Sequence, residues 1–281
     1  MSINIVPIDY RSPECAEQFV ASLRKTGFGV LRNHPIPEEL VTRIYQDWQA
    51  FFDSDEKHEY LFNRENQDGF FPVDAAETAK GFTVRDIKEY FHYYDWGQCP
   101  ENLKKDLDEY YLAAVALASE LLAWVEKYSP REVAENYREP LSGILEQGGQ
   151  SLLRILHYPP LSGDEEQDAI RAAAHEDINL LTILPAANEP GLQVLTKENN
   201  WIDVPCEFNT LIINTGDMLQ EASQGYFPST THRVINPEGS DGNKPRISLP
   251  LFLHPRKDVV LSDRYTAWSY LQERLKELGT K

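Results

Sequence analysis

The sequence contains few cysteines, no long hydrophobic run and no recognisable leader, and each absence excludes a class of protein. Cys15, Cys99 and Cys206 are widely spaced and form no C-x-x-C pair, so neither a disulfide framework nor a zinc ribbon is indicated. The longest apolar runs, Leu112–Ala118 and Leu249–Leu253, are far shorter than the roughly 18–20 residues that cross a bilayer. The opening MSINIVPIDYRSPE lacks the basic and apolar regions of a secretory signal. We therefore expect a cytoplasmic protein without a membrane segment.

Basic residues are also scarce. The 281 residues include 27 Lys and Arg against 45 Asp and Glu, which gives a formal net charge of −18. Such a chain repels nucleic acid and anionic lipid unless it carries a basic stripe, and no stripe is visible. G-x-G-x-x-G and Walker A loops are absent as well. The composition, 41% hydrophobic and 11% aromatic, is that of a chain with a packed core. Small molecules are the expected partners.

The pattern of apolar residues changes halfway along the chain. Segments 14–26, 38–52 and 101–128 have apolar residues at helical spacing, and Gly27 is a typical residue to end the first helix. Residues 63–100 are irregular and rich in aromatic side chains. From Gln150 onward the pattern is that of short strands separated by turns. The predicted strands are 151–158, 178–184, 191–195, 201–204, 210–214, 231–235 and 246–253.

Several short strands at this spacing favour an antiparallel sandwich or jelly roll. A final amphipathic helix is predicted over about 264–278. No repeat, low-complexity tract or flexible linker interrupts the chain. The sequence therefore predicts helices first, then a small β-barrel, then one closing helix.

Two histidines and an aspartate are candidate metal ligands. In an extended segment, His175 and Asp177 point the same way, and His232 follows 57 positions later. Two imidazoles and one carboxylate on one face of an iron ion leave the opposite positions open for substrate and dioxygen. An H-x-D pair alone is common by chance, so a structural role is the alternative. For the other histidines we expect packing or surface roles: His34, His58, His92, His157 and His254.

Two arginines are expected to face the barrel interior. Arg246 and Ser248 share a face of the strand 246–253, and an inward guanidinium needs an anionic partner such as a bound carboxylate. A structural arginine paired with one of the many acids is the alternative. Tyr158 is placed to donate a hydrogen bond to the same carboxylate. Arg154, four positions before Tyr158, is predicted to point inward as well.

Several motifs, in order, resemble the isopenicillin N synthase-like family of Fe(II)/2-oxoglutarate-dependent dioxygenases. HEDINLLTIL, GLQVL, NTGDMLQEASQGYFPSTTHRV and PRISLPLFLHP are similar to the catalytic barrel of that family. VPIDY…KTGFGVLRNHPIP is similar to its N-terminal region, and DGFFPV…DIKEYFHY to its connecting segment. The resemblance covers nearly the whole chain. It implies a double-stranded β-helix, a jelly roll, with flanking helices. The implied division is a helical N-terminal region (1–149), the jelly-roll domain (150–256) and a C-terminal helix packed on the core (257–281).

The resemblance also implies roles for the residues that match the family's motifs. His175, Asp177 and His232 match the three iron ligands. Arg246 and Ser248 match the R-x-S pair that holds the distal carboxylate of 2-oxoglutarate. The implied cofactor is Fe(II), the co-substrate is 2-oxoglutarate, and ascorbate is a candidate reductant.

Further residues of the barrel are assigned more loosely. Tyr158 matches the tyrosine of the family's N-Y-Y-P motif, but this chain reads LHYPP, with Leu156 at the asparagine position. One hydrogen bond to the co-substrate is then missing. Arg154, Lys88 and Phe91 are candidate substrate contacts, with a solvated lysine and core aromatics as the alternatives.

The activity implied by the resemblance is oxidation of a small polar or anionic metabolite by dioxygen, with release of succinate and CO₂. The alternative is an iron oxidase of the same fold that does not use 2-oxoglutarate, like isopenicillin N synthase or aminocyclopropane-carboxylate oxidase. A third candidate is an inactive binding or regulatory protein. Both monomer and homodimer are compatible with the sequence.

Overall fold

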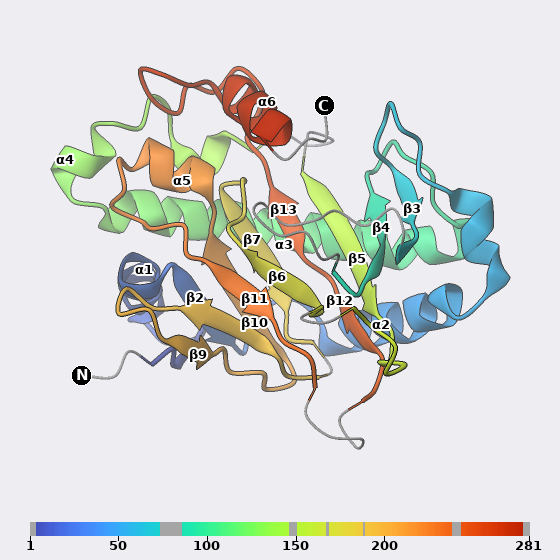
Figure 1. The fold of residues 1–281 in the computed structure, drawn as a ribbon. Helices are drawn as coiled ribbons and strands as arrows, with labels where there is room; N and C mark the ends of the chain where they lie inside the picture. Colours follow the sequence, from blue (N-terminus) through green and yellow to red (C-terminus); the bar gives the residue numbers. More distant parts are fainter. Residues whose placement is uncertain are drawn as a thin grey trace.

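The computed structural model describes residues 4–73, 86–145, 151–166, 169–187, 189–237 and 243–277 (Figure 1). Its helices are α1 (Cys15–Thr26), α2 (Glu38–Phe52), α3 (Glu101–Tyr128), α4 (Arg131–Ala134), α5 (Asp217–Ala222) and α6 (Ala267–Glu277), with 3-10 helices η1 (Asp55–Tyr60) and η3 (Leu141–Gly143). Its strands are β1 (Pro7–Asp9), β2 (Phe28–Arg32), β3 (Gly69–Phe71), β4 (Glu89–Tyr93), β5 (Leu152–Tyr158), β6 (Ala172–His175), β7 (Leu181–Pro185), β8 (Leu192–Leu195), β9 (Trp201–Asp203), β10 (Thr210–Thr215), β11 (His232–Val234), β12 (Arg246–Ser248) and β13 (Leu251–Leu253).

Two sheets form the core. The large sheet has the order β1-β2-β10-β7-β13-β5-β4-β3, with β12 also paired to β5. The small sheet has the order β6-β11-β8-β9. An apolar cluster joins the facing sides of the two sheets, since it holds Tyr90, Leu156 and Ile212 of the large sheet with Leu192 and Val234 of the small one. The expected jelly roll is confirmed.

Helices cover the other face of the large sheet. Helix α2 contacts β5 and β12, and α3 contacts β7 and β13 (Figure 1). The helices predicted over 38–52 and 101–128 have those bounds, and their apolar stripes are buried against the sheet. Gly27 ends α1 with φ of +72°, and its N–H donates to the Leu23 carbonyl, as the sequence predicted. None of the helices in the described ranges is long and apolar enough to cross a membrane.

The N-terminal half also holds four strands that the sequence pattern did not predict. Strands β1 to β4 are three to five residues long and join the large sheet beside the jelly-roll strands. All five residues of β4 are buried, so it shows none of the polar and apolar alternation that identifies a strand. The strand predicted over 246–253 is divided into β12 and β13, since Pro250 between them has no N–H for a ladder.

One glycine is needed for the turn beneath the candidate site. Gly216 precedes α5, and a Cβ atom there would lie 2.2 Å from the backbone oxygen of Asn179. A backbone atom cannot move aside as a flexible side chain does, so we expect Gly216→Ala to destabilise the fold by about 2–3 kcal/mol. Urea unfolding measures this change. The control Gly143→Ala, where a Cβ meets no atom within 4 Å, is expected to change stability by less than about 0.5 kcal/mol. Equal unfolding midpoints for both variants would contradict the steric argument.

Candidate functional site

The structure brings His175, Asp177 and His232 together between the two sheets. His175 ends β6 and pairs across the ladder with His232, the first residue of β11. The Nε2 atom of each histidine lies 3.8 Å from Oδ1 of Asp177, and the ligand atoms of all three residues lie within 4.8 Å of one another. The sequence spacing thus predicted a real cluster. Two imidazole nitrogens and one carboxylate oxygen are a ligand set that suits iron(II).

Neighbouring groups fix the orientation of these three side chains. Nδ1 of His175 lies 2.7 Å from the Ala173 carbonyl, and Nδ1 of His232 lies 3.1 Å from the Thr230 carbonyl. A carbonyl only accepts, so each Nδ1 donates its proton and each Nε2 keeps a lone pair for a metal. Oδ2 of Asp177 accepts hydrogen bonds from the Thr182 hydroxyl and, at 2.7 Å, from the Asn214 amide. Oδ1 faces the imidazoles.

The surroundings also set protonation states that a metal requires. Burial, followed by the adjacent His232, lowers the pKa of His175 to about 4. Burial raises the pKa of Asp177, but the two histidines and the hydrogen bonds from Thr182 and Asn214 outweigh it, so the pKa lies below its usual value. At neutral pH, His175 is therefore neutral and Asp177 ionised, as metal ligands must be.

The Asn214 amide offers a test of this outer support. We expect Asn214→Ala to weaken binding of Fe(II), or of Co(II) as a probe, by about 10–100-fold, because Asp177 loses a partner that fixes its carboxylate. Metal titration of the purified protein measures the dissociation constant. Asn136→Ala removes a half-buried amide that bonds to Glu132 and Gln224 and not to a metal ligand, and serves as the matched control, with unchanged affinity expected. Equal affinity for both variants would show that Asn214 does not support the ligand.

A second polar cluster lies on β5 and β12. Arg246 is directly opposite Tyr158 in the antiparallel ladder, and Ser248 is opposite Leu156. The Arg246 side chain is 2% exposed, with its guanidinium 5.3 Å from the centroid of the Tyr158 ring. Its Nε donates to the Glu189 carbonyl, whereas its Nη1 has no hydrogen-bond partner among the described residues. A buried cation with an unused donor suits a bound carboxylate.

A third cluster lies on the same face of the large sheet. Arg154 on β5 pairs with His92 on β4, and its Nε donates to Nε2 of His92 at 2.8 Å. Nδ1 of His92 in turn donates to the Gln67 carbonyl, so the ring is neutral and holds the guanidinium in place. The ammonium of Lys88 is buried and paired with Asp86, whose Oδ1 accepts a hydrogen bond at 2.9 Å from the Ala173 N–H, two positions before His175. Burial is the main cause that lowers the pKa of His92 and His175, and the Lys88 charge adds to it. The structure therefore places Lys88 near the metal ligands, and a solvated lysine is excluded.

Phe91 is a correction to the sequence prediction. The sequence offers it as a candidate substrate contact, with a core aromatic as the alternative. Its ring packs against Trp48 and Phe51 on the helix-covered face of the sheet, so the core alternative holds. Side chains of a strand alternate between faces, so Tyr90 and His92 point to the barrel interior instead. For His92 the sequence predicts only a packing role. Its contact with Arg154 is not detectable unless residues 89–93 are recognised as a strand.

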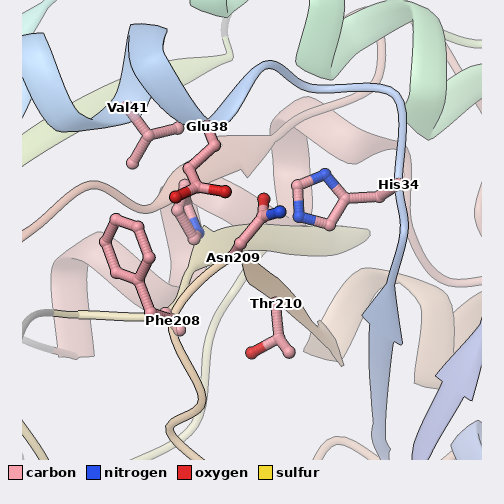
Figure 2. Close-up of a pocket in the computed structure, with 8 residues that line it drawn as sticks. His34, Glu38, Val41, Phe208, Asn209 and Thr210 are labelled. Atoms are coloured by element: carbon pink, nitrogen blue, oxygen red, sulfur yellow. The ribbon is translucent and has the colours of Figure 1, made fainter.

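A separate small hollow lies outside this site. It is lined by His34 after β2, by Glu38 and Val41 of α2, and by Phe208, Asn209 and Thr210 (Figure 2). Thr210 begins β10, whereas Asn214, which bonds to Asp177, lies near the opposite end of that strand. The hollow contains none of the clustered ligands and is not part of the candidate metal centre.

Comparison with known proteins gives consistent matches over the whole chain. A model of the 2OG-Fe(II) oxygenase superfamily matches residues 149–255, and one of the non-haem dioxygenase N-terminal region, named for morphine synthesis, matches residues 3–110. The crystal structure of a candidate oxygenase from Shewanella oneidensis is 61% identical, with a TM-score of 0.90 and 99% of both chains covered.

More distant relatives agree with these matches. The 2-oxoglutarate-dependent dioxygenase 11 of Oryza sativa subsp. japonica is 28% identical over 269 residues, which are 89% of this chain and 70% of that protein. The crystal structure of a full-length Neurospora crassa protein in complex with alpha-KG has a TM-score of 0.79 at 22% identity, with 97% of this chain and 95% of that chain covered, and supports the fold.

Proposed function

The chain belongs to the 2OG-Fe(II) oxygenase superfamily, and from this premise we propose which of its residues form the active site. The iron(II) is held by His175, Asp177 and His232. The distal carboxylate of 2-oxoglutarate is bound by Arg246, Ser248 and Tyr158. The observation that carries this proposal is the convergence of the three metal-ligand atoms within 4.8 Å, with Asp177 fixed from behind by Thr182 and Asn214.

The residues present fit both groups. The metal ligands are two neutral imidazole nitrogens and one carboxylate, which are the ligands that bind non-haem iron. The unused Nη1 of buried Arg246 suits a dianion that needs its distal charge neutralised. When bound, iron(II) and 2-oxoglutarate supply the oxidising chemistry, in which dioxygen is reduced, 2-oxoglutarate becomes succinate and CO₂, and a small-molecule substrate is oxidised.

The protein's own groups orient these partners. The imidazoles are held by backbone carbonyls, so Nε2 of His175 and of His232 stays directed at the metal position. Apolar side chains between the sheets, among them Tyr90 and Leu156, form part of the surrounding wall. No observation favours the alternative of an oxidase that dispenses with 2-oxoglutarate.

The first test is an anaerobic titration of the metal-free protein with Fe(II) and then with 2-oxoglutarate. We expect the weak visible charge-transfer band of the chelated co-substrate to appear, and to be lost in His175→Ala and in Arg246→Ala. Iron binding without any band in the unmodified protein would contradict the assignment. In that case, binding of candidate substrate carboxylates to Arg246 and Ser248 is the next measurement.

The substrate carries a carboxylate or a comparably polar acceptor group that meets Arg154. Support comes from the chain of hydrogen bonds that fixes this guanidinium through His92, and from the Lys88 charge, which also acts on His92. Arg154 lies on β5, and Lys88 is the residue immediately before β4, its neighbour in the sheet.

Substitution of Arg154 measures this contact. We expect Arg154→Leu to lower kcat/KM for the substrate by about 10–100-fold, because a charge-assisted hydrogen bond is lost, and to leave the 2-oxoglutarate affinity unchanged. Candidate small carboxylic acids are screened by stimulated succinate formation in the unmodified protein. Arg233→Leu is the matched control, since Arg233 lies over the Trp201 ring, away from the Arg154 wall. Unchanged affinity and turnover in Arg154→Leu would exclude the proposed role.

A further inference from the structure

A second buried arginine that the sequence analysis did not single out lies just before β6. Arg171 is 1% exposed and is among the largest fully buried side chains of the described residues. One of its terminal nitrogens, Nη2, donates to the Lys244 carbonyl at 2.7 Å. Its Nε has no hydrogen-bond partner in the described part of the chain. A buried guanidinium with an unused donor is rare, because no hydrogen bond offsets the free energy of desolvating that N–H group.

Arg171 and Arg246 converge on the same tyrosine from opposite sheets. Arg171 leads into β6 of the small sheet, and Arg246 begins β12, which pairs with β5 of the large sheet. Their guanidinium groups lie 5.9 Å and 5.3 Å from the centroid of the Tyr158 ring. Burial, and then the charge of Arg246, lowers the pKa of Arg171. The two cations are therefore close enough to repel each other.

Among the described residues, little negative charge balances this pair. Glu189 acts on Arg171 only as a charge that partly offsets the repulsion, and it meets Arg246 through its backbone carbonyl. Neither guanidinium has a carboxylate within ion-pair distance among the described residues. Two buried like charges, each with an unused donor, are unfavourable alone and become favourable when an anion enters between them.

We infer that Arg171 is a second guanidinium ligand for the distal carboxylate of the co-substrate, beside Arg246. This inference rests on the proposed function, which assigns Arg246, Ser248 and Tyr158 to that carboxylate. It adds a cation from the small sheet, so the carboxylate is held between both sheets of the barrel.

The test compares two keto acids that differ only at the distal end. 2-Oxopentanoate has a methyl group where 2-oxoglutarate has its distal carboxylate. Dissociation constants for both are measured by calorimetry on the full-length protein loaded with Mn(II), without dioxygen. We expect Arg171→Met to weaken 2-oxoglutarate binding by about 10–100-fold, which is the effect of a lost hydrogen bond to a charged group. The dissociation constant of 2-oxopentanoate is expected to change by less than about twofold. Arg171→Lys is expected to recover part of the 2-oxoglutarate affinity.

Other results overturn the inference. An equal loss for both keto acids, or no loss for either, shows that Arg171 only holds the Lys244 carbonyl. Arg171→Gln removes the charge but keeps an amide donor for that carbonyl, so it decides the question if Arg171→Met does not fold. Arg246→Met is measured in parallel. If Arg246→Met also leaves 2-oxoglutarate affinity intact, the assigned carboxylate pocket itself is wrong. If only Arg171→Met does so, the pocket stands and Arg171 is not part of it.

Discussion

Asp177→Ala is expected to reduce 2-oxoglutarate turnover by at least about 10³-fold, or about 4 kcal/mol of barrier. Asp177 supplies the only carboxylate of the metal cluster, and its Oδ1 lies 3.8 Å from Nε2 of both histidines. Without it the two imidazoles offer no negative charge to offset the metal ion, and the site loses one of three ligands. Succinate formation and the Fe(II) dissociation constant are measured, and we expect the loss of turnover to be accompanied by weaker iron binding.

The neighbouring residue provides the matched control for this experiment. Glu176 precedes Asp177 in the chain, but its exposed carboxylate accepts a hydrogen bond from the Thr231 hydroxyl instead of joining the cluster. Glu176→Ala is expected to keep iron affinity and turnover near the original values. If Asp177→Ala still binds iron as tightly as Glu176→Ala, then the carboxylate at 177 is not a ligand, and the assignment of the metal centre is wrong.

The metal cluster could be predicted because it depends on short-range rules. His175 and Asp177 are two positions apart, and an extended backbone places such residues on one side. The order of the motifs then supplied His232, 57 positions later, which no local rule would have selected. The helices α2 and α3 were predicted with their observed bounds for a similar reason: each has a continuous apolar stripe at helical spacing.

What could not be predicted depends on contacts between distant segments. Residues 89–93 form a strand buried on both faces, and without that strand the faces of Phe91 and His92 could not be told apart. A solvated Lys88 stayed open as an alternative because nothing in the sequence shows that Asp86 pairs with it in a buried position. Arg171 has no motif of its own. Its importance appears only when β6 and β12 bring it beside Arg246.

Arg246→Met is expected to weaken 2-oxoglutarate binding by about 10²–10³-fold, the effect of removing one partner of a buried charge pair. Arg246 is 2% exposed, so in the variant water cannot take the place of the guanidinium beside the distal carboxylate. The substitution keeps the length and apolar stem of the side chain, which limits repacking against Tyr158. The anaerobic charge-transfer titration gives the dissociation constant directly.

Comparison with the neighbouring hydroxyl separates charge from general damage to the pocket. Ser248 lies two positions further along β12 on the same face, and Ser248→Ala removes only a neutral hydrogen bond. We expect that variant to weaken 2-oxoglutarate binding by about fivefold, close to 1 kcal/mol of binding free energy. A much larger loss of 2-oxoglutarate affinity in Arg246→Met than in Ser248→Ala therefore shows that the charge of Arg246 acts on the co-substrate. If Arg246→Met instead keeps its 2-oxoglutarate affinity and loses affinity for the substrate, the guanidinium holds a substrate carboxylate, and the co-substrate must be bound elsewhere in the barrel.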